Sequence, residues 1–143
     1  MGNSDMDALR AILAASPRPQ SLAERRGRVG EGTATDPRGP AITVTPVDAG
    51  GVPGEWSLAP GADKARVLLF LHGGGYSSGS LKSHRTMVTG AGRAAGIRTL
   101  AVAYRLAPEH PFPAALDDAE AAYGFLLAQG YAARHIAVGG DSA

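Results

Sequence analysis

The chain has 143 residues and a formal net charge of +1, so nucleic acid and anionic membranes are not expected partners. It contains no cysteine, which excludes disulfides, thiolate catalysis and cysteine-based metal sites. Its apolar runs are too short to span a bilayer, and the N-terminus lacks the basic-then-apolar order of a secretion signal. We therefore expect a cytoplasmic protein that forms one domain or part of a larger one.

The N-terminal segment, residues 1–40, contains two helix signals followed by a long turn-rich stretch. A first helix is expected to begin near Ser4, and Ser21 is the expected cap of a second, short basic helix that runs through Arg26. Residues 27–40 are rich in glycine, proline and threonine and indicate a loop. We predict a lid over a pocket here, with a solvated arm as the alternative.

Short strands are predicted next. Residues 42–45 and 55–58 have strand-like composition, and the turn residues between them at 48–51 predict a hairpin. The unbroken apolar run Val67–Leu71 then fits a strand that is buried on both faces.

The second half alternates strand and helix signals. Ser83 is the expected cap of a helix that Gly96 ends, and residues 97–104 form the next apolar strand. A further helix that Gly130 closes leads to a last strand at 136–138. Two βαβ units of this kind predict parallel strands with helices on the faces of the sheet.

A glycine triplet, Gly73–Gly75, follows the buried strand at once. Glycines leave backbone N–H groups bare, which suits a phosphate or the oxyanion of an acyl-transfer intermediate. A dinucleotide fingerprint is not met, because Ser78 stands at the third glycine position and Gly79 comes one residue late.

The residues Gly140–Ala143 fill the first four positions of G-x-S-x-G directly after the last strand. In that motif the serine sits on a tight strand-to-helix turn, and the N–H after it is an oxyanion donor beside those of an HGGG-type loop. The two motifs at the ends of two buried strands are together a specific signal for acyl transfer.

With these motifs the sequence resembles the N-terminal half of a hormone-sensitive-lipase-like bacterial carboxylesterase. The residues that carry the resemblance are His72–Tyr76, Tyr104–Asp118 and Gly140–Ala143. The resemblance implies an α/β-hydrolase fold, with a mostly parallel central sheet and helices on both faces. It also implies a small helical cap over residues 1–40 and the N-terminal part of a catalytic domain over residues 41–143.

The resemblance assigns Ser142 as the nucleophile. It implies an oxyanion hole made by the backbone N–H groups of Gly74, Gly75, Ala143 and, as a further candidate, Gly73. His72 would support the glycine loop through its ring, and Tyr76 would line the substrate pocket. No metal or organic cofactor is implied.

In the family, the acid and the histidine of the triad follow the serine, whereas this chain ends one residue past Ser142. We expect both groups in the remainder of the same polypeptide, and we expect the fragment alone to be inactive. His84 is expected to be solvated, and His110 to have a structural role with Glu109. Asp141 is expected to be too close to the serine to serve as the carboxylate behind the catalytic histidine.

Two acidic residues open the second predicted helix of the βαβ units. Asp117 and Asp118 are expected to do no more than interact with the dipole of that helix.

The expected function is therefore hydrolysis of small, short-acyl esters by a serine carboxylesterase through an acyl-enzyme. A non-catalytic receptor on the same fold, which lacks the histidine, and a related amidase or peptidase are the alternatives. The sequence leaves a homodimer open.

Overall fold

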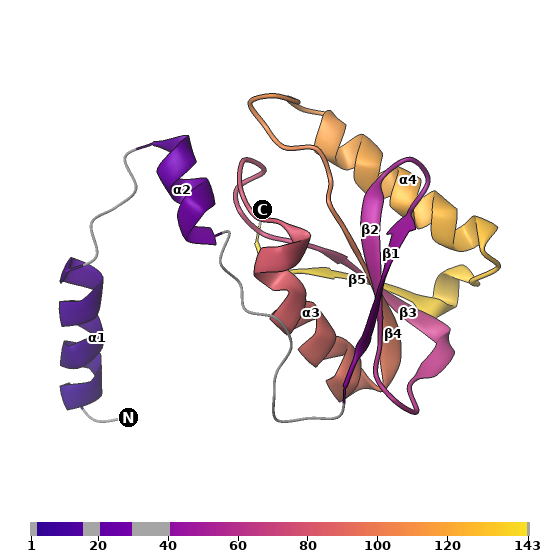
Figure 1. Cartoon of the computed structure of the whole chain (residues 1–143), viewed down its shortest axis with the longest axis horizontal. Helices are drawn as coiled ribbons and strands as arrows, with labels where there is room; N and C mark the ends of the chain where they lie inside the picture. Colours follow the sequence, from indigo (N-terminus) through magenta and orange to yellow (C-terminus); the bar gives the residue numbers. More distant parts are fainter. Residues whose placement is uncertain (1–2, 16–20, 30–40, 143) are drawn as a thin grey trace.

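The computed structural model describes residues 3–15, 21–29 and 41–142. Its centre is a five-stranded mixed sheet in the order β1-β2-β4-β3-β5 (Figure 1). The strands are β1 (Thr43–Asp48), β2 (Pro53–Leu58), β3 (Asp63–Leu71), β4 (Ile97–Val102) and β5 (Ile136–Gly140). The predicted loop lies, from residue 30 on, outside the described residues, and so does Ala143.

The predicted hairpin is confirmed as β1 and β2, which pair antiparallel. Its turn is closed by the Asp48 carboxylate, which accepts the Gly51 N–H at 2.5 Å, and by the Ala49 N–H, which donates to the Val52 carbonyl at 2.8 Å. β2 also pairs antiparallel with β4. The hairpin therefore extends the parallel part of the sheet at one side.

β3 lies between β4 and β5 and is parallel to both. At its carboxyl end, Leu71 pairs with Val102 of β4 and with Gly140 of β5. The segments that leave β3 and β5 therefore start side by side at one edge of the sheet. The glycine triplet and the turn of residues 140–142, which follow these strands, are therefore neighbours in space.

Helices cover both faces of the sheet, as predicted. α3 (Leu81–Ala95) packs on one face, where Val88 meets Phe70 and Ala101. α4 (Ala114–Ala128) packs on the other face over the larger core cluster, and the short helix η1 (Ala133–His135) leads from it into β5. The buried members of that cluster are Ala49, Val52, Trp56, Val67, Leu69, Leu100, Val102, Ala122 and Leu126.

The start of α3 differs from the prediction, because Ser80 and not Ser83 is its N-cap. The Ser80 hydroxyl accepts the Ser83 N–H at 3.0 Å, and the Ser83 hydroxyl accepts the Ser80 N–H at 2.9 Å. The two serines, three residues apart, form a capping box. Serine is a favoured N-cap residue at either position, so the sequence alone does not distinguish the two. At the other end, Gly96 adopts the predicted left-handed conformation with φ 65°.

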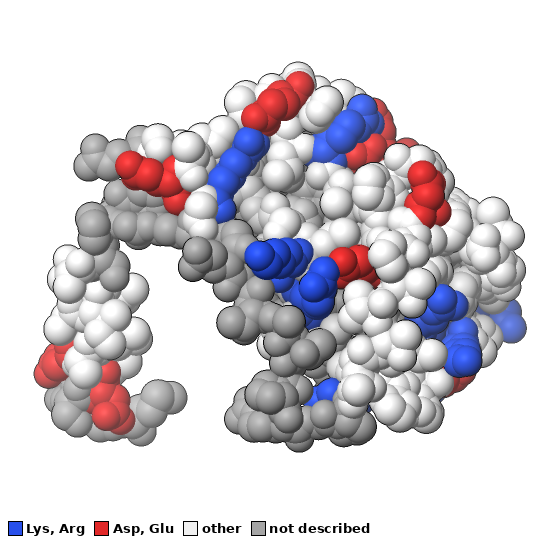
Figure 2. All heavy atoms as spheres, viewed as in Figure 1, with Lys and Arg blue, Asp and Glu red and all other residues white. Residues whose placement is uncertain are grey.

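Two helices precede the sheet: α1 (Asn3–Ala15) and α2 (Leu22–Val29). The Ser21 hydroxyl accepts the Glu24 N–H at 3.1 Å, as expected of a cap, and α2 runs three residues beyond its predicted end. None of the described helices is both long and apolar enough to cross a bilayer. In Figure 2, acidic and basic side chains are interspersed over the visible face rather than gathered by sign.

Two glycines of α3 give a matched test of how this helix packs. A β-carbon on Gly92 would lie 2.5 Å from the Thr99 methyl of β4, whereas one on Gly90 would have no neighbour within 4 Å. We expect Gly90→Ala to raise the free energy of unfolding by about 0.5–1 kcal/mol through helix propensity. Gly92→Ala is expected to lower it by roughly 1–3 kcal/mol, because the overlap is with a buried side chain. Urea unfolding of both variants of the complete protein measures the difference, and equal effects would contradict this packing.

Candidate active site

The glycine loop begins where β3 ends, and its backbone is left-handed. The φ angles are 137° at Gly74, 61° at Gly75 and 55° at Tyr76. A β-carbon on Gly74 would overlap the Ser78 carbonyl oxygen, so that position has no room for a side chain. The loop is therefore a tight coil of backbone, which requires glycine for steric as well as conformational reasons.

Two carbonyl groups of the loop are fixed by hydrogen bonds. The Gly73 oxygen lies 3.0 Å from His72 Nδ1, and the Gly74 oxygen accepts the Ser78 N–H at 3.1 Å and the Ser78 hydroxyl at 2.7 Å. In a trans peptide the next N–H points opposite to the carbonyl. The N–H groups of Gly74 and Gly75 are thus directed away from these contacts, and neither has a hydrogen-bond partner among the described residues.

The turn after β5 lies directly against this loop. A β-carbon on Gly73 would lie 2.9 Å from Ser142 Cβ and 2.8 Å from Asp141 Oδ2. A β-carbon on Gly140 would lie 2.6 Å from the Leu71 carbonyl oxygen. The two sequence motifs, almost seventy residues apart, therefore meet in van der Waals contact, and the exposed residue Ser142 lies beside the glycine loop.

The Asp141 carboxylate joins the two segments. Its Oδ1 accepts the Gly73 N–H at 2.7 Å, and its Oδ2 lies 3.1 Å from Nε2 of His84, whose side chain is only 11% exposed. The expectation that His84 is solvated is therefore wrong. The first turn of α3 returns over the glycine loop and brings the ring to the carboxylate, and local sequence does not show this. The Gly73 N–H is already used, which favours Gly74 and Gly75 as oxyanion donors.

His72 is 5% exposed and stacks on the ring of Tyr104, with centroids 4.3 Å apart. The Tyr104 hydroxyl donates to the His72 carbonyl oxygen. Burial lowers the pKa of His72, and burial also raises the pKa of Tyr104 to about 12. Both rings are therefore neutral at pH 7, and a neutral His72 with its proton on Nδ1 donates to the Gly73 carbonyl.

The connector between β4 and α4 is fixed by a pair that the sequence did not indicate. Asp118 accepts the backbone N–H of Arg105 at 2.7 Å and the Arg105 guanidinium at 2.8 Å. The expectation of a helix-dipole contact alone is therefore incomplete for Asp118. Arg105 lies three residues beyond the end of β4, and Asp118 follows the first turn of α4, so neither position marks the other in the sequence.

A cavity of about 560 Å³ opens at this edge of the sheet. Ser142 and Tyr76 both line it, and most of the remaining lining is apolar. His110 also lines the cavity, whereas Glu109, its expected structural partner, is held by Arg26. The apolar part of the wall includes Leu71, Phe112, Leu116, Ala119 and Val138.

The described residues offer no group of three or more histidine, aspartate or glutamate side chains that could hold a metal ion. What the site does present is a hydroxyl, two unpaired backbone N–H groups and an apolar cavity. These groups can bind and polarise a carbonyl group.

Residues 68–143 match the family described as the alpha/beta hydrolase fold. The chain belongs to this family. The resemblance to hormone-sensitive-lipase-like esterases is also confirmed. The chain is 45% identical to an esterase of the bacterial hormone-sensitive lipase family, with a TM-score of 0.77 over 90% of this chain and 43% of that one.

Two further relatives carry informative names. An acetyl-hydrolase from Streptomyces hygroscopicus is 42% identical over 125 residues, which cover 87% of this chain and 40% of that protein. The structure of EstE5 soaked with p-nitrophenyl butyrate is 39% identical, with a TM-score of 0.84 over 94% of this chain and 46% of that one. The chain thus spans less than half the length of these relatives.

Acidification is expected to destabilise the folded protein through His72. Burial lowers its native pKa below the unfolded value of 6.5, so below that pH the unfolded chain binds more protons than the folded chain. The free energy of unfolding should then fall as the pH falls, by at most about 1.4 kcal/mol per pH unit for one proton, until the native pKa is passed. Urea unfolding of the wild type and of His72→Gln across this range measures the slope. The variant should show a shallower slope, and equal slopes would contradict a neutral, buried His72.

Proposed function

We propose that the complete protein carrying this chain is a serine carboxylesterase that hydrolyses small, short-acyl esters through an acyl-enzyme. The observation that carries the proposal is the contact between Gly73 and Ser142, with the Gly74 and Gly75 N–H groups unpaired beside it. A hydroxyl next to two free backbone donors is the arrangement that acyl transfer needs. The names of the relatives, acetyl-hydrolase and esterase, support the same reaction class.

In the proposed mechanism, Ser142 Oγ attacks the carbonyl carbon of the ester while a histidine takes the hydroxyl proton. The carbonyl oxygen becomes an oxyanion, which the N–H groups of Gly74 and Gly75 stabilise, with the Ala143 N–H as a third donor. The tetrahedral intermediate expels the alcohol, which receives the proton from the histidine. Water, activated by the same histidine, then attacks the acyl-enzyme and releases the acid and Ser142.

The base is proposed to lie in the remainder of the polypeptide. Two histidines near the site are engaged, because His72 Nδ1 faces the Gly73 carbonyl and His84 Nε2 faces the Asp141 carboxylate. Both rings hold backbone or carboxylate groups in place and are therefore poorly suited to move to the Ser142 hydroxyl. Relatives more than twice as long have room for a separate histidine and acid.

Short acyl chains can be accommodated in the cavity beside Ser142. Its volume of about 560 Å³ must hold both the acyl and the alcohol part, and its mainly apolar wall includes the side chain of Leu116. The relatives named for acetyl hydrolysis and soaked with a butyrate ester point the same way. No metal or organic cofactor takes part in the proposed reaction.

Replacement of the nucleophile tests the mechanism. In the complete protein, Ser142→Ala is expected to lower kcat for p-nitrophenyl acetate by at least about 10³-fold, because the acyl-enzyme cannot form. The wild type should release a burst of p-nitrophenol and should be labelled once by a serine-directed sulfonyl fluoride, whereas Ser142→Ala should do neither. Full activity in the variant would refute the nucleophile. A wild-type protein that binds esters without hydrolysing them would indicate a receptor.

A chain-length series tests the substrate class. We expect kcat/KM for p-nitrophenyl acetate and butyrate to exceed that for palmitate by at least about tenfold, because the relatives are named for acetyl hydrolysis or were soaked with a butyrate ester. Activity is compared below the critical micelle concentration of each ester. A preference for palmitate would indicate a lipase, and faster cleavage of matched anilides would indicate an amidase.

A further inference from the structure

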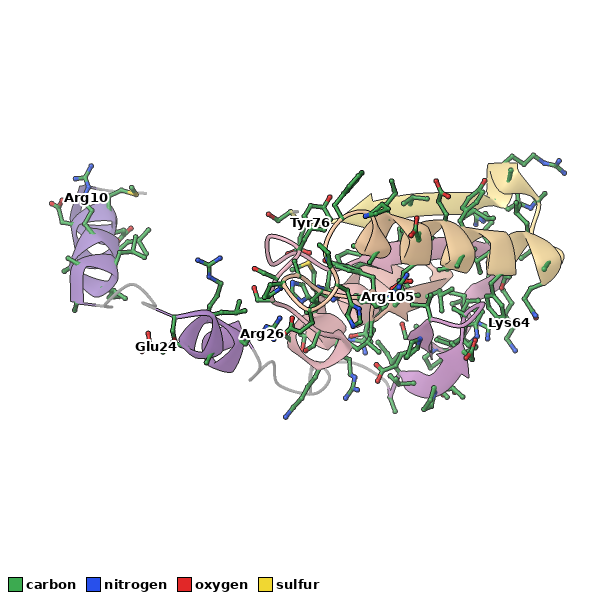
Figure 3. All side chains as sticks on the ribbon, turned by 90° about the horizontal axis from the view of Figure 1, so that it is seen from above. Arg10, Glu24, Arg26, Lys64, Tyr76 and Arg105 are labelled. Carbon is green, nitrogen blue, oxygen red and sulfur yellow. The ribbon has the colours of Figure 1, made fainter. Side chains whose placement is uncertain are left out.

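Arg26 of α2 reaches two loops that are distant in the sequence. Its Nε donates to the Ser77 carbonyl at 2.8 Å, and Nη2 donates to the Ala107 carbonyl at 3.0 Å. Ser77 belongs to the glycine loop, and Ala107 belongs to the connector between β4 and α4. In Figure 3 the labelled Arg26 extends from α2 towards the body that contains the sheet. One side chain of the predicted cap thus binds the backbone of both loops.

The same guanidinium is fixed by a carboxylate. Nη1 and Nη2 of Arg26 each donate to one oxygen of Glu109, and both distances are 2.8 Å. The hydrogen bond with Arg26 is the main reason why the pKa of Glu109 falls to about 2. Glu109 is therefore ionised at neutral pH and orients the planar fork so that its remaining donors face the two carbonyls. A lysine has no such fork and cannot reproduce the arrangement.

The two loops that Arg26 binds form one wall of the cavity. The Ala107 N–H donates to the Tyr76 carbonyl at 2.8 Å, which links the loops directly. Tyr76 and Ala107 both line the cavity, and Tyr76 has the left-handed φ of 55° that a tyrosine adopts only when its surroundings hold it. Arg26 contacts the wall from its outer side, at the residue after Tyr76 and at Ala107 itself.

We propose that Arg26 is a positioning residue that holds the Tyr76–Ala107 wall in place, so that α2 helps to form the substrate pocket. The inference rests on the proposed function, because it concerns the binding of the same ester. Arg26 donates to backbone carbonyls and a carboxylate and lies outside the set of reacting groups. Its loss should therefore weaken substrate binding and leave the chemistry at Ser142 in place.

The test uses Arg26→Ala in the complete protein, with Arg26→Lys and the neighbouring exposed residue in Arg25→Ala as comparisons. Arg26→Ala is expected to raise KM for p-nitrophenyl butyrate by about tenfold, since the lost bonds involve a charged donor, with kcat within about twofold. Arg26→Lys should give an intermediate KM, and Arg25→Ala should match the wild type. The fraction of molecules labelled at Ser142 should be the same in all four proteins.

Hydrogen exchange of the backbone supplies a readout that does not depend on ester hydrolysis. Arg26→Ala should exchange faster than the wild type in residues 21–29 and 74–78, and Arg25→Ala should not. An Arg26→Ala protein with the KM and exchange of Arg25→Ala would overturn the proposal. A decrease in the fraction of Arg26→Ala molecules labelled at Ser142, with KM and hydrogen exchange unchanged, would also overturn the proposal. Arg26 would then serve folding alone. If neither the wild type nor any variant cleaves esters, the proposed function fails. The difference in hydrogen exchange between Arg26→Ala and Arg25→Ala still decides whether Arg26 holds the wall.

Discussion

The hydrogen bond between the Gly73 N–H and the Asp141 carboxylate is the interaction on which the geometry of this site depends. It joins the loop that leaves β3 to the turn that leaves β5, across a contact in which Gly73 lies against Ser142. The parallel pairing of β3 and β5 brings the two segments to the same edge, but pairing alone does not fix their loops. The carboxylate does so, and His84 holds the carboxylate from the other side.

The direction of the loop amides follows from groups that face away from the cavity. His72 and Ser78 bind the carbonyls of Gly73 and Gly74, and each bound carbonyl turns the following N–H in the opposite direction. Tyr104 in turn holds the His72 ring by stacking and the His72 backbone by a hydrogen bond. The two N–H groups are thus oriented by the folded chain itself, which is the condition under which the proposed oxyanion hole would stabilise a developing charge.

Much of this arrangement could be predicted from the sequence, because its signals are local. The apolar run before the glycines predicted a buried strand, and alternation of strand and helix signals predicted parallel neighbours. The contact between Asp141 and His84 could not be predicted, since the two residues are 57 positions apart and neither lies in a periodic pattern. The contacts of Arg26 with the two loops could not be predicted either. Arg26 binds the backbone carbonyls of residues 77 and 107, and every residue has such a carbonyl, so the sequence does not mark these two.

The left-handed backbone at Tyr76 has a consequence for redesign of the pocket. Its carbonyl is held by Ala107 and the residues beside it are held by other groups, so the main chain there is fixed independently of the tyrosine ring. Asparagine and glycine adopt this conformation with less steric cost than an aromatic residue. Position 76 is therefore a place where the shape of the cavity wall can be changed while the N–H groups of Gly74 and Gly75 keep their orientation.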